Sequence, residues 1–226
     1  MQLWTQKQVK EQTGAERAGW IQALQSEVDS ISNMQVIERI TYKDVRRMEA
    51  ETGIKVDVLP SKIVWAEKPA EEAGSSKEKT PQQPGAARKK KARVVVCGNY
   101  QDKKAEEVYT NLMDASGLRV MTKVAAQKGW CLGKLDISTA FLNAALDGVV
   151  VCKPPQFLIQ QGMASETELW LLRRALYGLR VAPRAWEKER DDKMKKTSWT
   201  SEGRTFWYEQ TASDASIWRR LVNHRL

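Results

Sequence analysis

The feature that most constrains the fold of this 226-residue sequence is a polar segment in its first half, residues 68–90. The segment holds Pro, Gly, Ser, Lys and Glu and contains no large apolar side chain. Such a composition buries too little apolar surface to offset the entropy that is lost on ordering. Because strand-like sequence resumes at once at residues 92–97, we interpret the segment as a disordered loop inside one fold, not as a domain boundary.

Before this loop, the spacing of apolar residues predicts an amphipathic helix over residues 15–32. Its apolar face is formed by side chains three or four positions apart, namely Trp20, Leu24, Val28 and Ile31. A second, charged helix is expected to begin after Thr41, an N-cap with Asp44 three residues on, and to run toward Gly53. Strands are predicted on either side of that helix, at residues 36–40 and 58–66.

After the loop, strands and helices are mixed without a regular alternation, which indicates an α+β fold. The predicted helices cover residues 115–129, 138–145 and 183–196. The predicted strands cover residues 131–136, 149–153 and 169–172, and residues 205–221 are expected to form a hairpin.

The formal net charge of +9 favours a polyanionic partner, such as nucleic acid or an anionic membrane surface. A basic protein with a solvated surface is the alternative that charge alone leaves open. Three distant cysteines and one histidine argue against a zinc site and against a disulfide framework, and they fit a reducing compartment. Without a signal peptide or a run of roughly 20 apolar residues, we expect a soluble, intracellular protein of the cytoplasm or nucleus, with no membrane contact.

Four blocks, in this order, resemble the reverse transcriptase of Ty1/copia-type retrotransposons. They are KARVVVCGNYQ (91–101), LRVMTKVAAQKGWCLGKLDISTAFLNAAL (118–146), VCKPPQF (151–157) and LWLLRRALYGLRVAPRAW (169–186). The resemblance implies the fingers and part of the palm of a polymerase. Residues 1–57 would be a helical lead-in, residues 58–130 a fingers-like region and residues 131–226 a partial palm. It also implies RNA-directed DNA synthesis from dNTPs on an RNA or DNA template-primer.

The same resemblance places the first metal-binding carboxylate of the family at Asp136, directly after the predicted strand 131–136. The backbone carbonyl of Ile137 would be a further ligand of Mg²⁺. Nucleotidyl transfer by two magnesium ions about 4 Å apart requires several oxygen ligands. Taken alone, an aspartate before Ser-Thr is more often a helix N-cap, but the resemblance favours metal ligation.

The resemblance also implies a set of nucleotide-binding residues. Arg93 would bind the phosphates, since a guanidinium is planar and always charged. The backbone N–H groups of Thr139 and Ala140, at the start of a short helix, would face the triphosphate. Phe141 would crowd the sugar 2′ position, unless it is simply a core aromatic. Two residues would form a turn near the templating base, Tyr177 and Gly178.

The 226 residues contain no Tyr-x-Asp-Asp, the motif that supplies the second and third carboxylates of the family. The adjacent aspartates Asp191 and Asp192 lie in a charged, helical segment, where neighbouring side chains diverge, so we interpret them as solvated surface. The sequence therefore predicts a fragment that stops before the catalytic hairpin and is inactive as a polymerase by itself. Whether it is an enzyme stays open, and the alternative is a non-catalytic remnant that binds nucleic acid.

Overall fold

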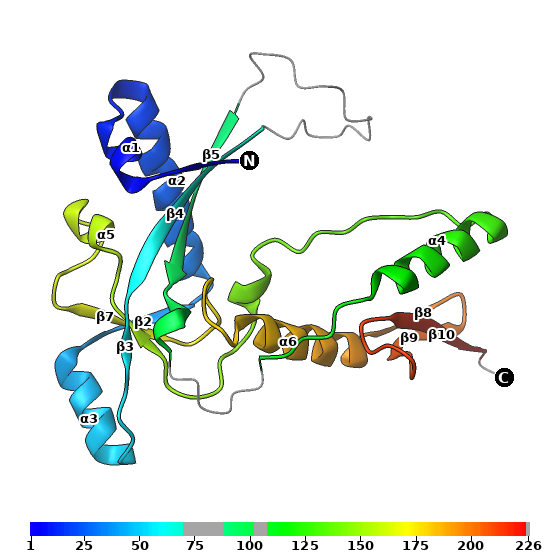
Figure 1. The fold of residues 1–226 in the computed structure, drawn as a ribbon. Coiled ribbons are helices and arrows are strands. Elements are labelled where there is room, and N and C mark those ends of the chain that lie inside the picture. Colours follow the sequence, from blue (N-terminus) through cyan, green and yellow to red (C-terminus); the bar gives the residue numbers. More distant parts are fainter. Residues whose placement is uncertain (70–87, 102–107, 225–226) are drawn as a thin grey trace.

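The computed structural model describes residues 1–69, 88–101 and 108–224 (Figure 1). The helices in these ranges are α1 (Gln6–Glu11), α2 (Gly14–Asn33), α3 (Tyr42–Thr52), α4 (Ala115–Lys128), α5 (Gln156–Gln160) and α6 (Ala182–Lys196), with the 3₁₀ helices η1 (Gly98–Tyr100) and η2 (Ala140–Asn143). The strands are β1 (Gln2–Trp4), β2 (Ile37–Thr41), β3 (Val58–Leu59), β4 (Ser61–Pro69), β5 (Arg88–Val96), β6 (Val151–Cys152), β7 (Glu168–Leu172), β8 (Ser198–Ser201), β9 (Arg204–Gln210) and β10 (Trp218–His224). They form three sheets, ordered β1-β4-β5, β2-β7-β6-β3 and β10-β9-β8. Helices are thus mixed with largely antiparallel strands, as the α+β prediction expects.

The first sheet is a long antiparallel hairpin of β4 and β5, with β1 on the far side of β4. Its last pair joins Pro69 to Arg88, so both ends of the segment predicted as a loop belong to strands. Residues 70–87 of that segment lie outside the described residues. Pro60 divides the strand predicted at residues 58–66, because β3 pairs in the second sheet and β4 in the first.

A chain of aromatic rings packs α2 and α5 against the first sheet. The ring centroids of Trp4 and Trp20 lie 5.5 Å apart, those of Trp20 and Trp65 5.8 Å, and those of Trp65 and Phe157 5.4 Å. The last two pairs are edge-to-face, a geometry that aromatic rings favour. The apolar face predicted for the first long helix is confirmed, since its four residues are buried in this core.

The second sheet packs α3 on a small core of its own. Thr41 and Asp44 form the predicted cap in full, because each side chain accepts from the backbone N–H of the other. The helix ends where the sequence predicts, at Gly53, which adopts the left-handed conformation with φ = 68°. Strand β7 lies between β2 and β6, and it confirms the strand predicted at residues 169–172.

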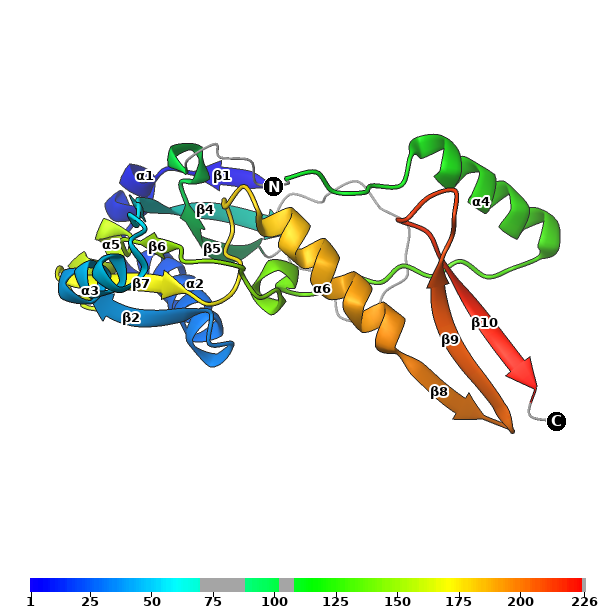
Figure 2. The same ribbon diagram turned by 90° about the horizontal axis from the view of Figure 1, so that it is seen from below.

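Helix α6 leads from these two sheets to the third sheet, which lies away from them together with α4 (Figures 1 and 2). The hairpin predicted at residues 205–221 is confirmed as the antiparallel pair of β9 and β10, and β8 adds a third strand. No helix in the described ranges is both long and apolar enough to cross a membrane.

One strand prediction is wrong. Residues 131–136 have no regular structure, and the side chains of Leu132 and Leu135 are 70% and 88% exposed. A strand needs a neighbour for its backbone groups, and within the described residues none pairs with this segment. The preceding helix α4 confirms the prediction for residues 115–129, but it also exposes Leu118, Val120 and Met121. Apolar sequence alone therefore did not produce a strand here.

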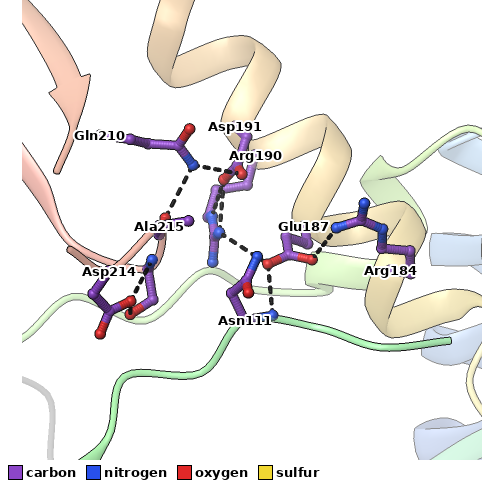
Figure 3. Close-up of polar contacts among 9 residues, drawn as sticks. Asn111, Arg184, Glu187, Arg190, Asp191, Gln210, Asp214 and Ala215 are labelled. Atoms are coloured by element: carbon purple, nitrogen blue, oxygen red, sulfur yellow. Dashed lines mark hydrogen bonds and ion pairs between the residues drawn. The ribbon is translucent and has the colours of Figure 1, made fainter. Parts of the chain in front are cut away.

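Glu187 on α6 ties the helix to the segment before α4 (Figure 3). Its carboxylate accepts from the backbone N–H of Asn111 at 2.8 Å and from Arg184 at 2.7 Å. The residue is only 3% exposed. Burial by itself would raise the pKa of Glu187, but the hydrogen bonds from Arg184 and Asn111 outweigh it and hold the pKa below its usual value.

Asp191, one turn further along α6, corrects the prediction that both adjacent aspartates are solvated. Its carboxylate accepts from Gln210 of β9 at 2.9 Å, and the Gln210 amide also donates to the carbonyl of Ala215 (Figure 3). Asp191 is half-buried, whereas Asp192 is exposed. The side chains of Asp191 and Asp192 therefore have different surroundings, as helix geometry predicts for neighbouring residues. Asp191 joins α6 to the third sheet.

We predict that Glu187→Ala lowers the free energy of unfolding by about 2 kcal/mol, because it removes charge-assisted hydrogen bonds to a buried carboxylate. Urea denaturation measures this change. Since the pKa of Glu187 is lowered, its contribution is present above pH 4.5 and is lost as pH falls from there through the folded-state pKa. The wild type and the variant should therefore converge in acid.

The matched control is Glu189→Ala on the same helix, where the carboxylate pairs with Lys193 at 3.1 Å on the surface. A helical pair of this kind contributes only about 0.3–0.5 kcal/mol. If both variants lost the same free energy of unfolding, the buried contacts of Glu187 would contribute no more to stability than a surface ion pair.

Candidate functional site

Three of the predicted nucleotide-binding side chains lie together although they are far apart in the sequence. The guanidinium carbon of Arg93, on β5, lies 4.8 Å from the ring centroid of Tyr177. The ring of Tyr177 meets that of Phe141, on η2, edge-to-face at 5.8 Å. We call Arg93, Tyr177 and Phe141 the arginine–aromatic cluster. All three are partly exposed, so the cluster combines a fixed cation with two accessible rings.

The Tyr177–Gly178 turn is held directly against β5. The N–H of Val96 donates to the carbonyl of Tyr177 at 2.8 Å. Gly178 has φ = 88°, and a Cβ there would lie 2.1 Å from the Val96 carbonyl oxygen. A Cβ on Gly98 would lie 2.3 Å from the carbonyl oxygen of Gly178. Two glycines thus let two backbones approach more closely than any side chain allows, and this approach brings Tyr177 to Arg93.

Glu27 is a residue of this site that the sequence interpretation missed. Its carboxylate, on α2, accepts from the N–H of Val94 at 3.3 Å, and its side chain is 8% exposed. Strand β5 is the edge of its sheet, so this N–H has no neighbouring strand. A signal was present in the sequence, since Glu27 stands three residues after Leu24 and four before Ile31, on the apolar face of the helix.

The charges around the cluster shift several pKa values. Burial raises the pKa of Glu27, although the Val94 N–H and the cations of Arg93 and Lys91 act in the opposite direction. Burial also raises the pKa of Tyr177, and the cation of Arg93 opposes that change. The pKa of Lys91 is lowered by burial first and by Arg93 second. Positive charge is therefore concentrated on β5, and only part of it is compensated by the Glu27 carboxylate.

The guanidinium of Arg93 has unused hydrogen-bonding capacity. Its Nε is buried and donates to no acceptor within the described residues. A buried donor without an acceptor costs about 1–3 kcal/mol. The indole N–H groups of Trp4, Trp20 and Trp65 in the aromatic core are likewise buried without an acceptor, so the position of Arg93 beside two accessible rings is what distinguishes it.

Asp136 and Ile137 do not belong to this cluster. Both are exposed, in the irregular segment between α4 and η2. No hydrogen bond or ion pair links the Asp136 carboxylate to another described residue. Nor do any three His, Cys, Asp or Glu side chains of the described ranges lie close enough to hold a metal ion. The described residues therefore bring no partner carboxylate to Asp136, and the metal-binding role of Asp136 and Ile137 stays a prediction.

Thr139 and Ala140 begin a shorter element than predicted. Instead of a helix over residues 138–145, the structure has the four-residue η2, and Thr139 adopts a left-handed conformation with φ = 51°. The carbonyl of Thr139 accepts from the N–H of Leu142 at 2.9 Å. A helix of one turn has only a small dipole, so this N-terminus offers little attraction to an anion. The phosphate-binding role of these two residues stays a prediction.

A family model described as reverse transcriptase (RNA-dependent DNA polymerase) matches residues 67–206, which is more than half of the chain. The Retrovirus-related Pol polyproteins from transposons RE1 and RE2 of Arabidopsis thaliana are 33% and 32% identical to the chain over 108 residues. The one from transposon TNT 1-94 of Nicotiana tabacum is 31% identical over 108 residues. No solved structure matches the chain.

Each of these matches covers 46% of the chain but only 7% of the two Arabidopsis polyproteins and 8% of the Nicotiana one. The matched segment is thus a small part of each relative. What those polyproteins do as whole molecules does not transfer to this chain by similarity alone.

We predict that Gly178→Ala lowers the free energy of unfolding by about 3 kcal/mol, because the new Cβ would meet the Val96 carbonyl and the backbone would be strained. Gly129→Ala is the control, since Gly129 also has a positive φ, 65°, but nothing lies within 4 Å of a Cβ there. Strain alone should cost that variant about 1 kcal/mol. Chemical denaturation measures both, and equal losses would contradict the close approach of the turn to β5.

Proposed function

The chain belongs to the reverse transcriptase (RNA-dependent DNA polymerase) family, of the kind carried by Pol polyproteins of copia-type retrotransposons, and on that premise we propose that its arginine–aromatic cluster binds an incoming deoxynucleotide. Arg93 would hold the phosphates, and the rings of Phe141 and Tyr177 would contact the sugar and base. In this proposal residues 58–130 act as fingers, residues 131–226 as part of a palm and residues 1–57 as a helical lead-in.

The observation that carries this proposal is the convergence of Arg93, Phe141 and Tyr177 from three separate segments. A packed core would also bring rings together, but it would not keep a partly exposed guanidinium beside them. Arginine binds phosphate through paired N–H donors, and stacking on a ring fixes the plane of the guanidinium. The cluster therefore has a fixed donor for an anion and an apolar surface beside it.

Strand β5 supplies a wider basic surface for a template-primer. Arg88 and Lys89 are exposed on it, and Lys91 is partly exposed. Two of its cations are engaged within the protein, since Arg88 pairs with Glu67 at 3.3 Å and Lys90 with Glu16 at 2.7 Å. Nucleic acid would thus be held by the remaining charge, and its affinity should fall steeply with salt.

Enzymes of this family use a divalent metal, and we propose that Mg²⁺ is the ion and that Asp136 and the Ile137 carbonyl contribute to its binding. Since the described residues bring no further carboxylate to Asp136, we also propose that the 226-residue polypeptide by itself does not catalyse DNA synthesis. A non-catalytic role in binding nucleic acid is the second candidate, and the exposed cations of β5 favour it.

The test of nucleotide binding compares Arg93→Ala with Lys89→Ala, an equal loss of charge at an exposed site on the same strand. We expect Arg93→Ala to weaken binding of a dNTP by about tenfold or more, because a charge-assisted contact contributes about 1.5–3 kcal/mol. Lys89→Ala should change it less than about threefold. Isothermal titration calorimetry measures both, and equal effects would show that only general charge attracts the nucleotide.

For catalysis, we expect no primer extension above background when the polypeptide is supplied with magnesium, four dNTPs and an RNA template with a DNA primer. A gel assay with a labelled primer measures this, with an active reverse transcriptase as the positive control. Product that disappears in Asp136→Asn would contradict the proposed inactivity, and it would show that Asp136 finds the other ligands it needs.

A further inference from the structure

The sheet β8–β9–β10 is separate from the sheet that contains β5, and helix α6 lies between the two (Figure 2). One face of this sheet carries aromatic residues. Trp199 is paired with Phe206, and their rings are stacked at 5.3 Å and 14°. The ring of Trp199 also lies 5.4 Å from that of Tyr208. Since paired residues and residues two apart share a face of a sheet, the three rings lie on the same face.

Arginines surround these rings on the same face. Arg204 shares it through β9, and Arg220 shares it as the partner of Tyr208. The guanidinium carbon of Arg220 lies 5.2 Å from the ring centroid of Phe206. Both arginines are exposed, and neither forms an ion pair within the described residues. We call Trp199, Arg204, Phe206, Tyr208 and Arg220 the aromatic face.

The two faces of this sheet differ in charge. The aromatic face carries no acidic residue on its three strands, because Glu209 points to the opposite side and pairs there with Arg219 at 2.7 Å. On the aromatic side of the sheet Gln210, at the end of β9, donates to Asp191 of helix α6. Trp199, on the edge strand β8, is 36% exposed, so its ring remains accessible, and the unpaired cations of Arg204 and Arg220 lie on the neighbouring strands β9 and β10.

We propose that the aromatic face binds single-stranded nucleic acid, with a base stacked on Trp199 and with Arg204 and Arg220 on the flanking phosphates. Exposed rings beside unpaired arginines are the combination that holds single strands, because every base has a π-face and every linkage a negative charge. A second copy of this chain fits less well, since two such faces would oppose like charges. This site goes beyond the proposed nucleotide site and uses none of its residues.

The test measures fluorescence anisotropy of labelled oligothymidylate with the full chain across a salt series. Trp199→Leu should weaken binding by roughly fivefold or more, in line with the loss of one base–ring contact, and should leave the salt dependence unchanged. Arg220→Gln should lower the slope of log K against log salt by about 0.7. Inorganic polyphosphate, which has no bases, should bind wild type and Trp199→Leu equally well.

Trp207→Leu is the matched control, because Trp207 lies on the opposite face of the same strand. An equal loss for Trp207→Leu, or an unchanged oligonucleotide affinity for Trp199→Leu, would overturn the proposal. So would a wild-type dimer in sedimentation that Trp199→Leu dissociates without a change in oligonucleotide affinity. If Trp199→Leu unfolds in a thermal melt, Arg204→Gln and Arg220→Gln replace it in the test, because both arginines are exposed. A lower slope of log K against log salt supports the proposal, and an unchanged slope overturns it.

Arg93→Ala separates the two proposals. It should leave binding of the oligonucleotide within about twofold of wild type, since Arg93 lies on β5 and not on this sheet. Loss of dNTP binding alone in Arg93→Ala, and loss of oligonucleotide binding alone in Trp199→Leu, supports both sites. Loss of oligonucleotide binding in Arg93→Ala, with no change in Trp199→Leu, would place the single strand on β5 and overturn the aromatic face.

Discussion

The closure of the free edge of β5 is the constraint on which the rest of the structure depends. Two of the N–H groups on that edge are satisfied by different parts of the chain. The carboxylate of Glu27 accepts from Val94, and the carbonyl of Tyr177 accepts from Val96. An open edge of this length would invite pairing with another chain. Here it instead joins α2 and the Tyr177–Gly178 turn to one strand, so Arg93 acquires its surroundings as a consequence.

The two ends of the molecule are packed to different degrees. Around β4 and β5, aromatic and aliphatic side chains form one continuous core. This core includes residues from each of the ranges 1–57, 58–130 and 131–226. Beyond α6, the hydrogen bond from Gln210 to Asp191 joins the third sheet to the helix, and α4 exposes apolar side chains. Exposed apolar surface of this kind is where a protein meets further chain or ligand. The surfaces that are free to bind a partner therefore lie on the third sheet with α4 and at the arginine–aromatic cluster, not in the core.

Sequence patterns predicted the elements whose signals are local. The Thr41–Asp44 cap and Gly53 fixed both ends of α3, because a cap is made by residues within one turn. Periodicity identified α2, and it would also have identified Glu27 if a charge on an apolar face had been treated as a site. The strand predicted at residues 131–136 was wrong because pairing is not a local property. The split at Pro60 and the burial of Asp191 were missed for the same reason, since each depends on a neighbour distant in sequence.

By itself the sequence determined the mixture of helices and strands, the faces they bury, the family resemblance and the residue types suited to phosphate and metal. Only the tertiary structure decided which of those residues meet. It brings Arg93, Tyr177 and Phe141 together through two glycines and a shared edge, and it leaves Asp136 exposed on an irregular segment. The physical reason is that residue type sets what a side chain can bind, whereas a site requires several side chains at one point. That convergence depends on long-range hydrogen bonds and packing, which no local pattern encodes.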